Sequence, residues 1–123
     1  MLKSKIHRAT VTQADVHYQG SLTLDTHLLH AADVVPFEEV HVWNVTRGTR
    51  FRTYAMRGEI GSGVVCANGA AALLVSPGDI IIVATFTILE DAELEGFKPK
   101  LVFVDEMNHI TSVKTEEVAG PGY

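Results

Sequence analysis

The chain has 123 residues, of which 46% are hydrophobic and 20% charged, and its formal net charge at pH 7 is -5. This size suits a single domain, and the acidic balance argues against nucleic acid or an anionic membrane as a partner, because both are bound by basic surfaces. No apolar run is long enough to span a bilayer and no signal-peptide stretch opens the chain, so a cytoplasmic location is expected.

Segments rich in β-branched and aromatic residues predict short strands along most of the chain. In chain order, strands are expected at residues 7–12, 17–24, 40–45, 51–56, 64–67, 80–87, 100–104 and 109–113. Turns at residues 46–49, 76–79 and 106–108 separate several of them. This many short strands in so small a chain predict a closed or nearly closed β-barrel.

Helical signals are few and weak. Asp25 or Thr26 is a suitable cap for a short helix that extends to Ala32. Single helical turns are expected at residues 70–74 and 91–96. The strand pattern stops at Lys114, so residues 115–123 are expected to be a disordered tail.

Cysteine and histidine usage limits the chemistry available to this chain. Cys66 is the only cysteine, which excludes an internal disulfide and a thiolate metal cluster. Cys66 lies in an apolar stretch and is expected to be a buried small residue, not a nucleophile. The histidines lack ligand spacing, so no metal site is predicted.

The dipeptide Gly20-Ser21 interrupts a strand pattern. The ordinary interpretation is a bulge or tight turn, in which glycine relieves a backbone clash. A chemical interpretation is also available: a serine hydroxyl beside a strained peptide can attack the preceding carbonyl and convert the amide into an ester. Elimination and hydrolysis would then leave a pyruvoyl group and release ammonia. Local spacing alone does not decide between the two interpretations.

A series of short motifs extends over nearly the whole chain. They are KIHRATVT (5–12), AD (14–15), HY (17–18), GS (20–21), WNV (43–45), GTRFRTYA (48–55), GSG (61–63), NGAAA (68–72), PGD (77–79) and KP (98–99). In this order they resemble the bacterial aspartate 1-decarboxylase family over roughly residues 1–110. Two positions depart from the usual pattern, because Ile60 stands where many relatives carry arginine and Leu73 where histidine is frequent. These departures put surface or assembly contacts nearby in question.

The resemblance implies a mainly β fold, a small double-psi β-barrel with a few short helices, usually assembled as a homotetramer with active sites between subunits. It implies one decarboxylase domain, residues 1–123, that cleaves itself into a β chain (1–20) and an α chain (21–123). The cofactor would be a covalently bound pyruvoyl group derived from Ser21, without pyridoxal phosphate or a metal. The reaction would convert L-aspartate to β-alanine and carbon dioxide through a Schiff base, for pantothenate and coenzyme A synthesis. Whether a maturation partner is needed stays open.

The resemblance also assigns roles to individual residues. Ser21 matches the pyruvoyl precursor, the Gly20–Ser21 bond the cleavage site, and Tyr54 the proton donor. The positions that match substrate-binding residues are Thr53, which also matches the processing threonine, the cations Arg50 and Lys5, and the backbone loop Gly69, Ala70 and Ala71. His7, Asn68 and Trp43 are expected to support the site.

The chemistry of the implied reaction suits these residue types. A fixed guanidinium such as that of Arg50 binds a carboxylate through two hydrogen bonds, worth about 2–4 kcal/mol when desolvated. A phenol such as that of Tyr54 can deliver a proton to the former α-carbon. Each residue also has an ordinary interpretation: Arg50 could pair with Glu59 on a hairpin surface, and Tyr54 could be half-buried packing. Lys5 and His7 share one strand face, which suits a solvated edge or a pocket wall.

The sequence therefore leaves three functions open. The first is self-processing decarboxylation of aspartate. The second keeps the pyruvoyl group but acts on another acidic amino acid, such as glutamate. The third is an uncleaved, non-catalytic β-barrel that binds a ligand.

Overall fold

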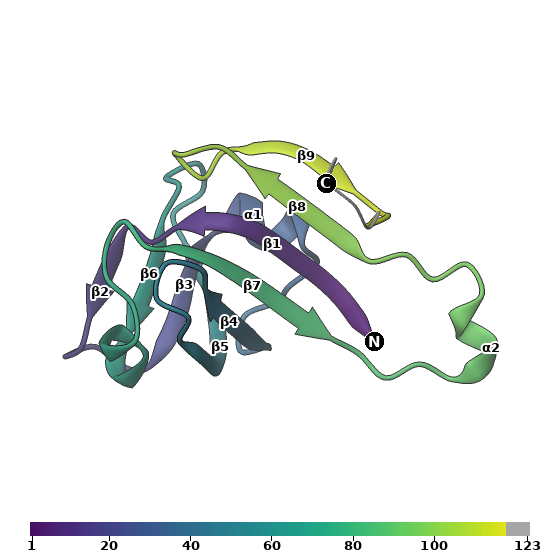
Figure 1. The fold of residues 1–123 in the computed structure, drawn as a ribbon, viewed down its shortest axis with the longest axis horizontal. Helices are drawn as coiled ribbons and strands as arrows, with labels where there is room; N and C mark the ends of the chain where they lie inside the picture. The colour runs from purple at the N-terminus through teal and green to yellow at the C-terminus, as the bar shows by residue number, and fades with distance from the viewer. Residues whose placement is uncertain (118–123) are drawn as a thin grey trace.

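The computed structural model describes residues 1–117, and in this part of the chain the strands form one curled, mixed sheet (Figure 1). Its strands are β1 (Leu2–Thr10), β2 (Gln13–Asp15), β3 (Ser21–Asp25), β4 (Glu39–Asn44), β5 (Arg50–Gly58), β6 (Val65–Asn68), β7 (Ile80–Phe86), β8 (Lys100–Val104) and β9 (Ile110–Lys114). Their order across the sheet is β2-β6-β3-β5-β4-β7-β1-β8-β9. The helices are α1 (Thr26–Ala31), α2 (Asp91–Leu94) and the 3₁₀ helix η1 (Gly69–Leu73). The prediction of a mainly β, small barrel with a few short helices is confirmed.

Hydrogen bonds between segments far apart in the order of the sheet close the barrel. Thr12, just beyond β1, donates its backbone N–H to the carbonyl of Val65 at 2.8 Å, and its hydroxyl accepts the Val65 N–H at 2.9 Å. The Asn108 amide donates to the carbonyls of Thr10 and Gly63, each at 2.8 Å. Because Asn108 follows β8, its amide links the β8–β9 turn to the β5–β6 loop.

Alternate residues of the central strands fill the barrel interior. Leu22 and Leu24 of β3, Ala55 of β5, and Val65 and Ala67 of β6 are all fully buried. Burial of these side chains is the main favourable contribution to folding. Because side chains alternate along a strand, Ser21 and Thr23 must lie on the opposite face from Leu22 and Leu24.

One predicted strand is wrong in its first half. The sequence pattern predicted a strand over residues 17–24, but the strand begins only at Ser21, after a turn at residues 16–17. Asp15 causes the turn, since its side chain accepts the His17 N–H at 3.0 Å and its carbonyl accepts the Tyr18 N–H at 3.4 Å. The Gly20–Ser21 bond therefore lies where a loop enters a strand, not within one.

Other element boundaries also differ from the prediction. The first strand was expected at residues 7–12 and spans Leu2–Thr10, and the short strand β2, which pairs in parallel with β6, was not predicted. The expected helix and both single turns are present as α1, η1 and α2. Of the expected disordered tail, residues 118–123 lie outside the described residues.

The connection from β7 to β8 carries α2 away from the sheet (Figure 1). Exposed apolar side chains accompany it, with Ile88 97% and Leu94 45% exposed. Over the described residues, no helix is long and apolar enough to cross a membrane.

Asp25 joins β3, α1 and the β5–β6 loop. Its carboxylate caps α1 by accepting the His27 N–H at 2.9 Å, and it also accepts the N–H groups of Gly61 and Gly63 at 3.0 and 2.8 Å. Burial by itself would raise the pKa of this carboxyl, but the three backbone hydrogen bonds and the nearby His27 together hold the pKa below its usual value. The ionised form is therefore stabilised by folding.

We expect Asp25→Ala to lower the free energy of unfolding by about 2–4 kcal/mol, because three buried or partly buried donors lose a charged acceptor. Since the folded pKa is depressed, this stabilisation is present above the unfolded carboxyl's pKa and is lost as pH falls through the folded value. Urea titrations at pH 7 and at acidic pH, in a Ser21→Ala background that keeps the chain whole, measure both effects. The exposed Glu106→Ala is the control, and an equal loss in both variants would contradict this role for Asp25.

Candidate active site

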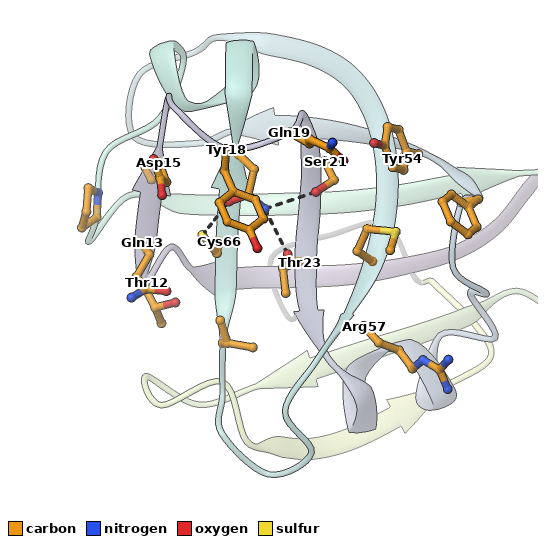
Figure 2. A pocket seen from close by; sticks show the side chains of 16 residues that line it. Thr12, Gln13, Asp15, Tyr18, Gln19, Ser21, Thr23, Tyr54, Arg57 and Cys66 are labelled. Atoms are coloured by element: carbon orange, nitrogen blue, oxygen red, sulfur yellow. Dashed lines mark hydrogen bonds between the residues drawn. The ribbon is translucent and has the colours of Figure 1, made fainter.

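Ser21 lies in the wall of a cavity of about 870 Å³. Figure 2 shows Ser21 and Tyr54 at the same end of this cavity, with the Arg57 side chain directed away from them. The cavity is lined by Thr12, Gln13, Ala14, Asp15, Tyr18, Gln19, Ser21, Thr23, Phe37, Tyr54, Met56, Arg57, Val64, Cys66, Asn68 and Pro77. The sequence-predicted residues that the fold brings together here are Ser21, Tyr54 and Asn68.

The pairing of β3 with its two neighbours places Ser21. Leu22 lies opposite Ala67 of β6 and opposite Ala55 of β5, and all three side chains face the core. Ser21, opposite Asn68, therefore faces the cavity, although only 5% of its surface is exposed. A hydroxyl so shielded from water has few competing solvent contacts.

Asn68 holds the Ser21 hydroxyl. Its side-chain amide donates to Ser21 Oγ at 3.2 Å and to Thr23 Oγ1 at 3.0 Å, the two dashed lines in Figure 2 that end on these residues. Its carbonyl oxygen accepts from Cys66 Sγ at 3.3 Å. Because the thiol donates to that oxygen, the NH₂ end of the amide is directed towards Ser21.

Cys66 is buried as expected, but it also lines the cavity, which the sequence did not indicate. Burial raises the pKa of the thiol, and the negative charge of Asp15 raises it further. A protonated thiol is a hydrogen-bond donor and a poor nucleophile. Its position is consistent with orienting Asn68.

Tyr54 and Thr53 lie on either side of the same strand. The Tyr54 ring stacks on Phe37, with ring centroids 6.0 Å apart and planes inclined by 23°. Phe37 and Tyr54 both line the cavity, so the phenol is held at its edge by an aromatic neighbour. Extending the β3–β5 register by two residues from the Leu22–Ala55 pair places Thr53 level with Gly20.

The predicted cations lie elsewhere on the chain. Lys5, His7, Trp43 and Arg50 are absent from the lining of this cavity, as residues 1–117 describe it. The Arg50 guanidinium carbon lies 5.7 Å from the centroid of the Trp43 ring, its cross-strand neighbour. This cation–π geometry differs from the surface pair with Glu59 that the sequence left open.

Lys5 and His7 lie on the parallel pair β1–β8. The Lys5 side chain is only 9% exposed, and its ammonium lies 3.3 Å from the carboxylate of Glu117, so a carboxylate already fits against it. His7 packs against Phe103, with ring centroids 5.4 Å apart. Burial lowers the pKa of His7, and the positive charges of Lys5 and Arg8 lower it further, which favours the neutral imidazole.

Sequence reasoning missed several cavity residues, notably Tyr18, Thr23, Phe37 and Cys66. Thr23 could have been found from strand alternation, because it follows Ser21 by two residues. Phe37 had no local signal, since a loop residue reaches the cavity only through tertiary folding. Among the described residues, no group of three or more His, Cys, Asp or Glu side chains could hold a metal ion.

Sequence similarity to known proteins identifies the family. The aspartate decarboxylase family model matches residues 1–111. The chain belongs to the aspartate decarboxylase family. Ser21, Tyr54, Asn68 and all the cations discussed above lie within the matched part of the chain.

Individual members of the aspartate decarboxylase family are similar over most of their length, and each of the following is named aspartate 1-decarboxylase. A protein from Myxococcus xanthus is 58% identical, covering 98% of this chain and 93% of the relative. One from Chromobacterium violaceum is 57% identical, covering 93% and 90%. One from Legionella pneumophila strain Lens is 52% identical, covering 96% and 89%.

The two departures from the family pattern are both at the surface. Ile60 is 59% exposed in the β5–β6 loop, and Leu73 is 74% exposed at the end of η1. Neither lines the cavity described over residues 1–117. Neither side chain therefore contributes to the described wall around Ser21.

We expect Cys66 to be alkylated by iodoacetamide at neutral pH roughly tenfold or more slowly in the folded chain than in urea, because burial and a raised pKa both suppress the thiolate. The rate should rise with pH above neutrality as the thiolate forms. Mass spectrometry of the labelled chain measures the modified fraction over time. Equal rates with and without urea would contradict the position given to Cys66.

Proposed function

We propose that this protein is an aspartate 1-decarboxylase that cleaves itself before Ser21 and uses the resulting pyruvoyl group to convert L-aspartate to β-alanine and carbon dioxide. The observation that carries the proposal is the Ser21 hydroxyl in the cavity wall, preceded by Gly20 and hydrogen-bonded to Asn68. Family membership and the names of its relatives support the substrate. The family's reaction supplies β-alanine for pantothenate and coenzyme A synthesis.

Self-cleavage uses atoms of the chain itself and one water. The Ser21 oxygen forms a bond to the Gly20 carbonyl carbon, and the Gly20–Ser21 amide bond breaks to give an ester. Loss of the Ser21 α-proton then breaks the bond between Cβ and the ester oxygen, which leaves Gly20 as a carboxylate and residue 21 as dehydroalanine. Water adds to this group and ammonia leaves, so the two fragments together gain one water and lose one ammonia.

The residues around Ser21 fit this sequence of steps. The hydroxyl is shielded from bulk water, and the Asn68 amide holds its oxygen at 3.2 Å. We propose that the Thr53 hydroxyl donates to the developing oxyanion on the Gly20 carbonyl, because extending the β3–β5 register brings Thr53 level with Gly20. Gly20 has no side chain to obstruct the distortion that the attack requires.

The pyruvoyl group, once formed, supplies an electrophilic ketone that withdraws electrons from the substrate's amine-bearing carbon. The chain's own residues supply the rest. Tyr54, on the same cavity, delivers the proton to the former α-carbon. The backbone N–H groups of Gly69, Ala70 and Ala71 bind substrate oxygens, as small side chains allow a close approach.

The cations Lys5 and Arg50 are proposed to bind the substrate carboxylate from a neighbouring copy of the chain. Neither lines the cavity that contains Ser21 in its own chain, as described over residues 1–117. The buried Lys5 ammonium accommodates a carboxylate, and Trp43 holds the Arg50 guanidinium. A homotetramer in which one copy supplies Ser21 and Tyr54 and another supplies the cations reconciles these positions. A cytoplasmic location and a maturation partner stay predictions.

Ser21→Ala should abolish both cleavage and turnover, because the nucleophilic oxygen and the pyruvoyl precursor are removed together. Mass spectrometry of the wild-type chain should show fragments 1–20 and 21–123 with masses that sum to a gain of water and a loss of ammonia. Assays of aspartate and glutamate should show carbon dioxide release from aspartate only.

The control for that experiment is Ser112→Ala on β9, at the far edge of the sheet from β3. It should cleave and turn over like the wild type. A wild-type chain that stays whole after prolonged heating, or a Ser21→Ala chain with undiminished function, would favour the non-catalytic binding module. Preference for glutamate would overturn the substrate assignment while leaving the cleavage intact.

Co-expression of an impaired variant with an inactive one tests whether the site is shared between copies. Arg50→Ala should still be cleaved, but its kcat/KM for aspartate should fall roughly 30-fold or more, because a desolvated carboxylate loses its cation. Co-expression with Ser21→Ala should restore activity in roughly a quarter of sites, where an intact Ser21 meets an intact Arg50 from another copy.

The matched control is Arg52→Ala, two residues along β5 and also exposed, which should lower kcat/KM much less than Arg50→Ala. After co-expression, decarboxylase activity should be measured on oligomers isolated by size-exclusion chromatography. Mixed oligomers no more active than the sum of the separate variants would show that each chain contains its own complete site.

A further inference from the structure

The corner between β6 and η1 is occupied by the chain's own cleavage segment. Gly69, the first residue of η1, has φ +67°, in the region that favours glycine. A Cβ on Gly69 would lie 2.7 Å from Gly20 Cα, 2.8 Å from Gly20 N and 3.1 Å from the carbonyl oxygen of Tyr18. All three atoms are backbone, so no side-chain rotation could relieve the contact.

The crowding lies on one side of the cleavage bond. A Cβ added to Gly20 would meet the Asn68 carbonyl oxygen at 3.9 Å, which is an ordinary contact. The backbone of Gly20 therefore lies where a Gly69 side chain would be, whereas a Cβ on Gly20 itself would fit without a clash. The next residue, Ser21, is held by its pairing with Asn68 and by the Asn68 amide.

We propose that Gly69 is a positioning residue for self-cleavage, whose lack of a side chain lets Gly20 lie against the β6–η1 corner and so sets the geometry of the Gly20–Ser21 peptide. This inference rests on the proposed function. Two adjacent residues of the corner then have separate roles. Asn68 holds the attacking oxygen of Ser21, and Gly69 leaves space for the backbone of Gly20, which carries the attacked carbonyl. Reactions within a chain are sensitive to such placement, and a displacement of about 1 Å can cost roughly 100-fold in rate.

The position of Gly20 also determines when the space beside Gly69 becomes available to substrate. In the uncleaved chain, Gly20 occupies the space beside Gly69, the first residue of the loop proposed to bind substrate. Cleavage converts Gly20 into a chain end that is free to leave. The same backbone corner thus holds the peptide bond before cleavage and becomes accessible to substrate afterwards.

Gly69→Ala tests the proposal, with Gly48→Ala as the matched control. Gly48 has φ +78°, so alanine causes a similar backbone strain there, but a Cβ at Gly48 would meet no atom within 4 Å. We expect Gly69→Ala to cleave at least about tenfold more slowly than Gly48→Ala, because only the former displaces Gly20. Mass spectrometry of full-length precursor at successive times measures both rates.

Stability is measured separately so that a folding defect is not mistaken for a cleavage defect. In the Ser21→Ala background, urea titration should show a larger loss for Gly69→Ala than for Gly48→Ala. If Gly69→Ala is unfolded in buffer, trimethylamine N-oxide can be added to all variants, since it favours the folded state. The rate is then compared for the folded fraction.

Equal cleavage rates in folded Gly69→Ala and Gly48→Ala would overturn the positioning role of Gly69. That result would leave the proposed function intact, because the wild type and Gly48→Ala would still cleave. Failure of the wild type to cleave would instead count against the proposed function itself. The two failures are therefore distinguishable.

Discussion

Burial of alternate side chains on β3 is the constraint on which the site depends. Leu22 and Leu24 are fully buried in the barrel, between partners on β5 and β6 that are equally buried. A shift of β3 by one residue would expose both leucines and bury Ser21 and Thr23 in the apolar interior. The hydrophobic core therefore determines that the Ser21 hydroxyl faces the cavity and meets Asn68.

The β6–η1 corner, residues 68 and 69, explains how the ordinary dipeptide Gly20-Ser21 could acquire a chemical role. Gly-Ser is a common turn sequence, and nothing in its local pattern distinguishes it from many others. Here the loop that carries Gly20 lies on Gly69, and Ser21 starts the strand that pairs with Asn68. Polar contacts and close backbone packing thus meet on either side of a single peptide bond.

The division of site residues between two regions of the chain has a physical cause. Arg50 and Tyr54 lie on one strand four residues apart, and alternation places them on the same face of β5. The sheet twists and curls along that strand, so only Tyr54 reaches the cavity with Ser21. Residues that share a face by pattern need not share a pocket, and a second copy of the chain is the proposed means of reuniting them.

The sequence alone determined the mainly β class, most strands, a short helix with Asp25 or Thr26 as its cap and, through its motifs, the family and the candidate residues. These depend on local propensity, alternation and residue identity, all of which are readable along the chain. Only the tertiary structure decided that the 17–24 segment is half loop, that Phe37 and Cys66 line the cavity, and that Gly69 supports Gly20. Such contacts join residues far apart in the chain, for example Gly20 and Gly69, which are separated by 49 positions (69 − 20), and no local pattern records them. For Ser21 itself, the sequence motifs identified it as the candidate pyruvoyl precursor, and the packing of β3 determined what its hydroxyl contacts.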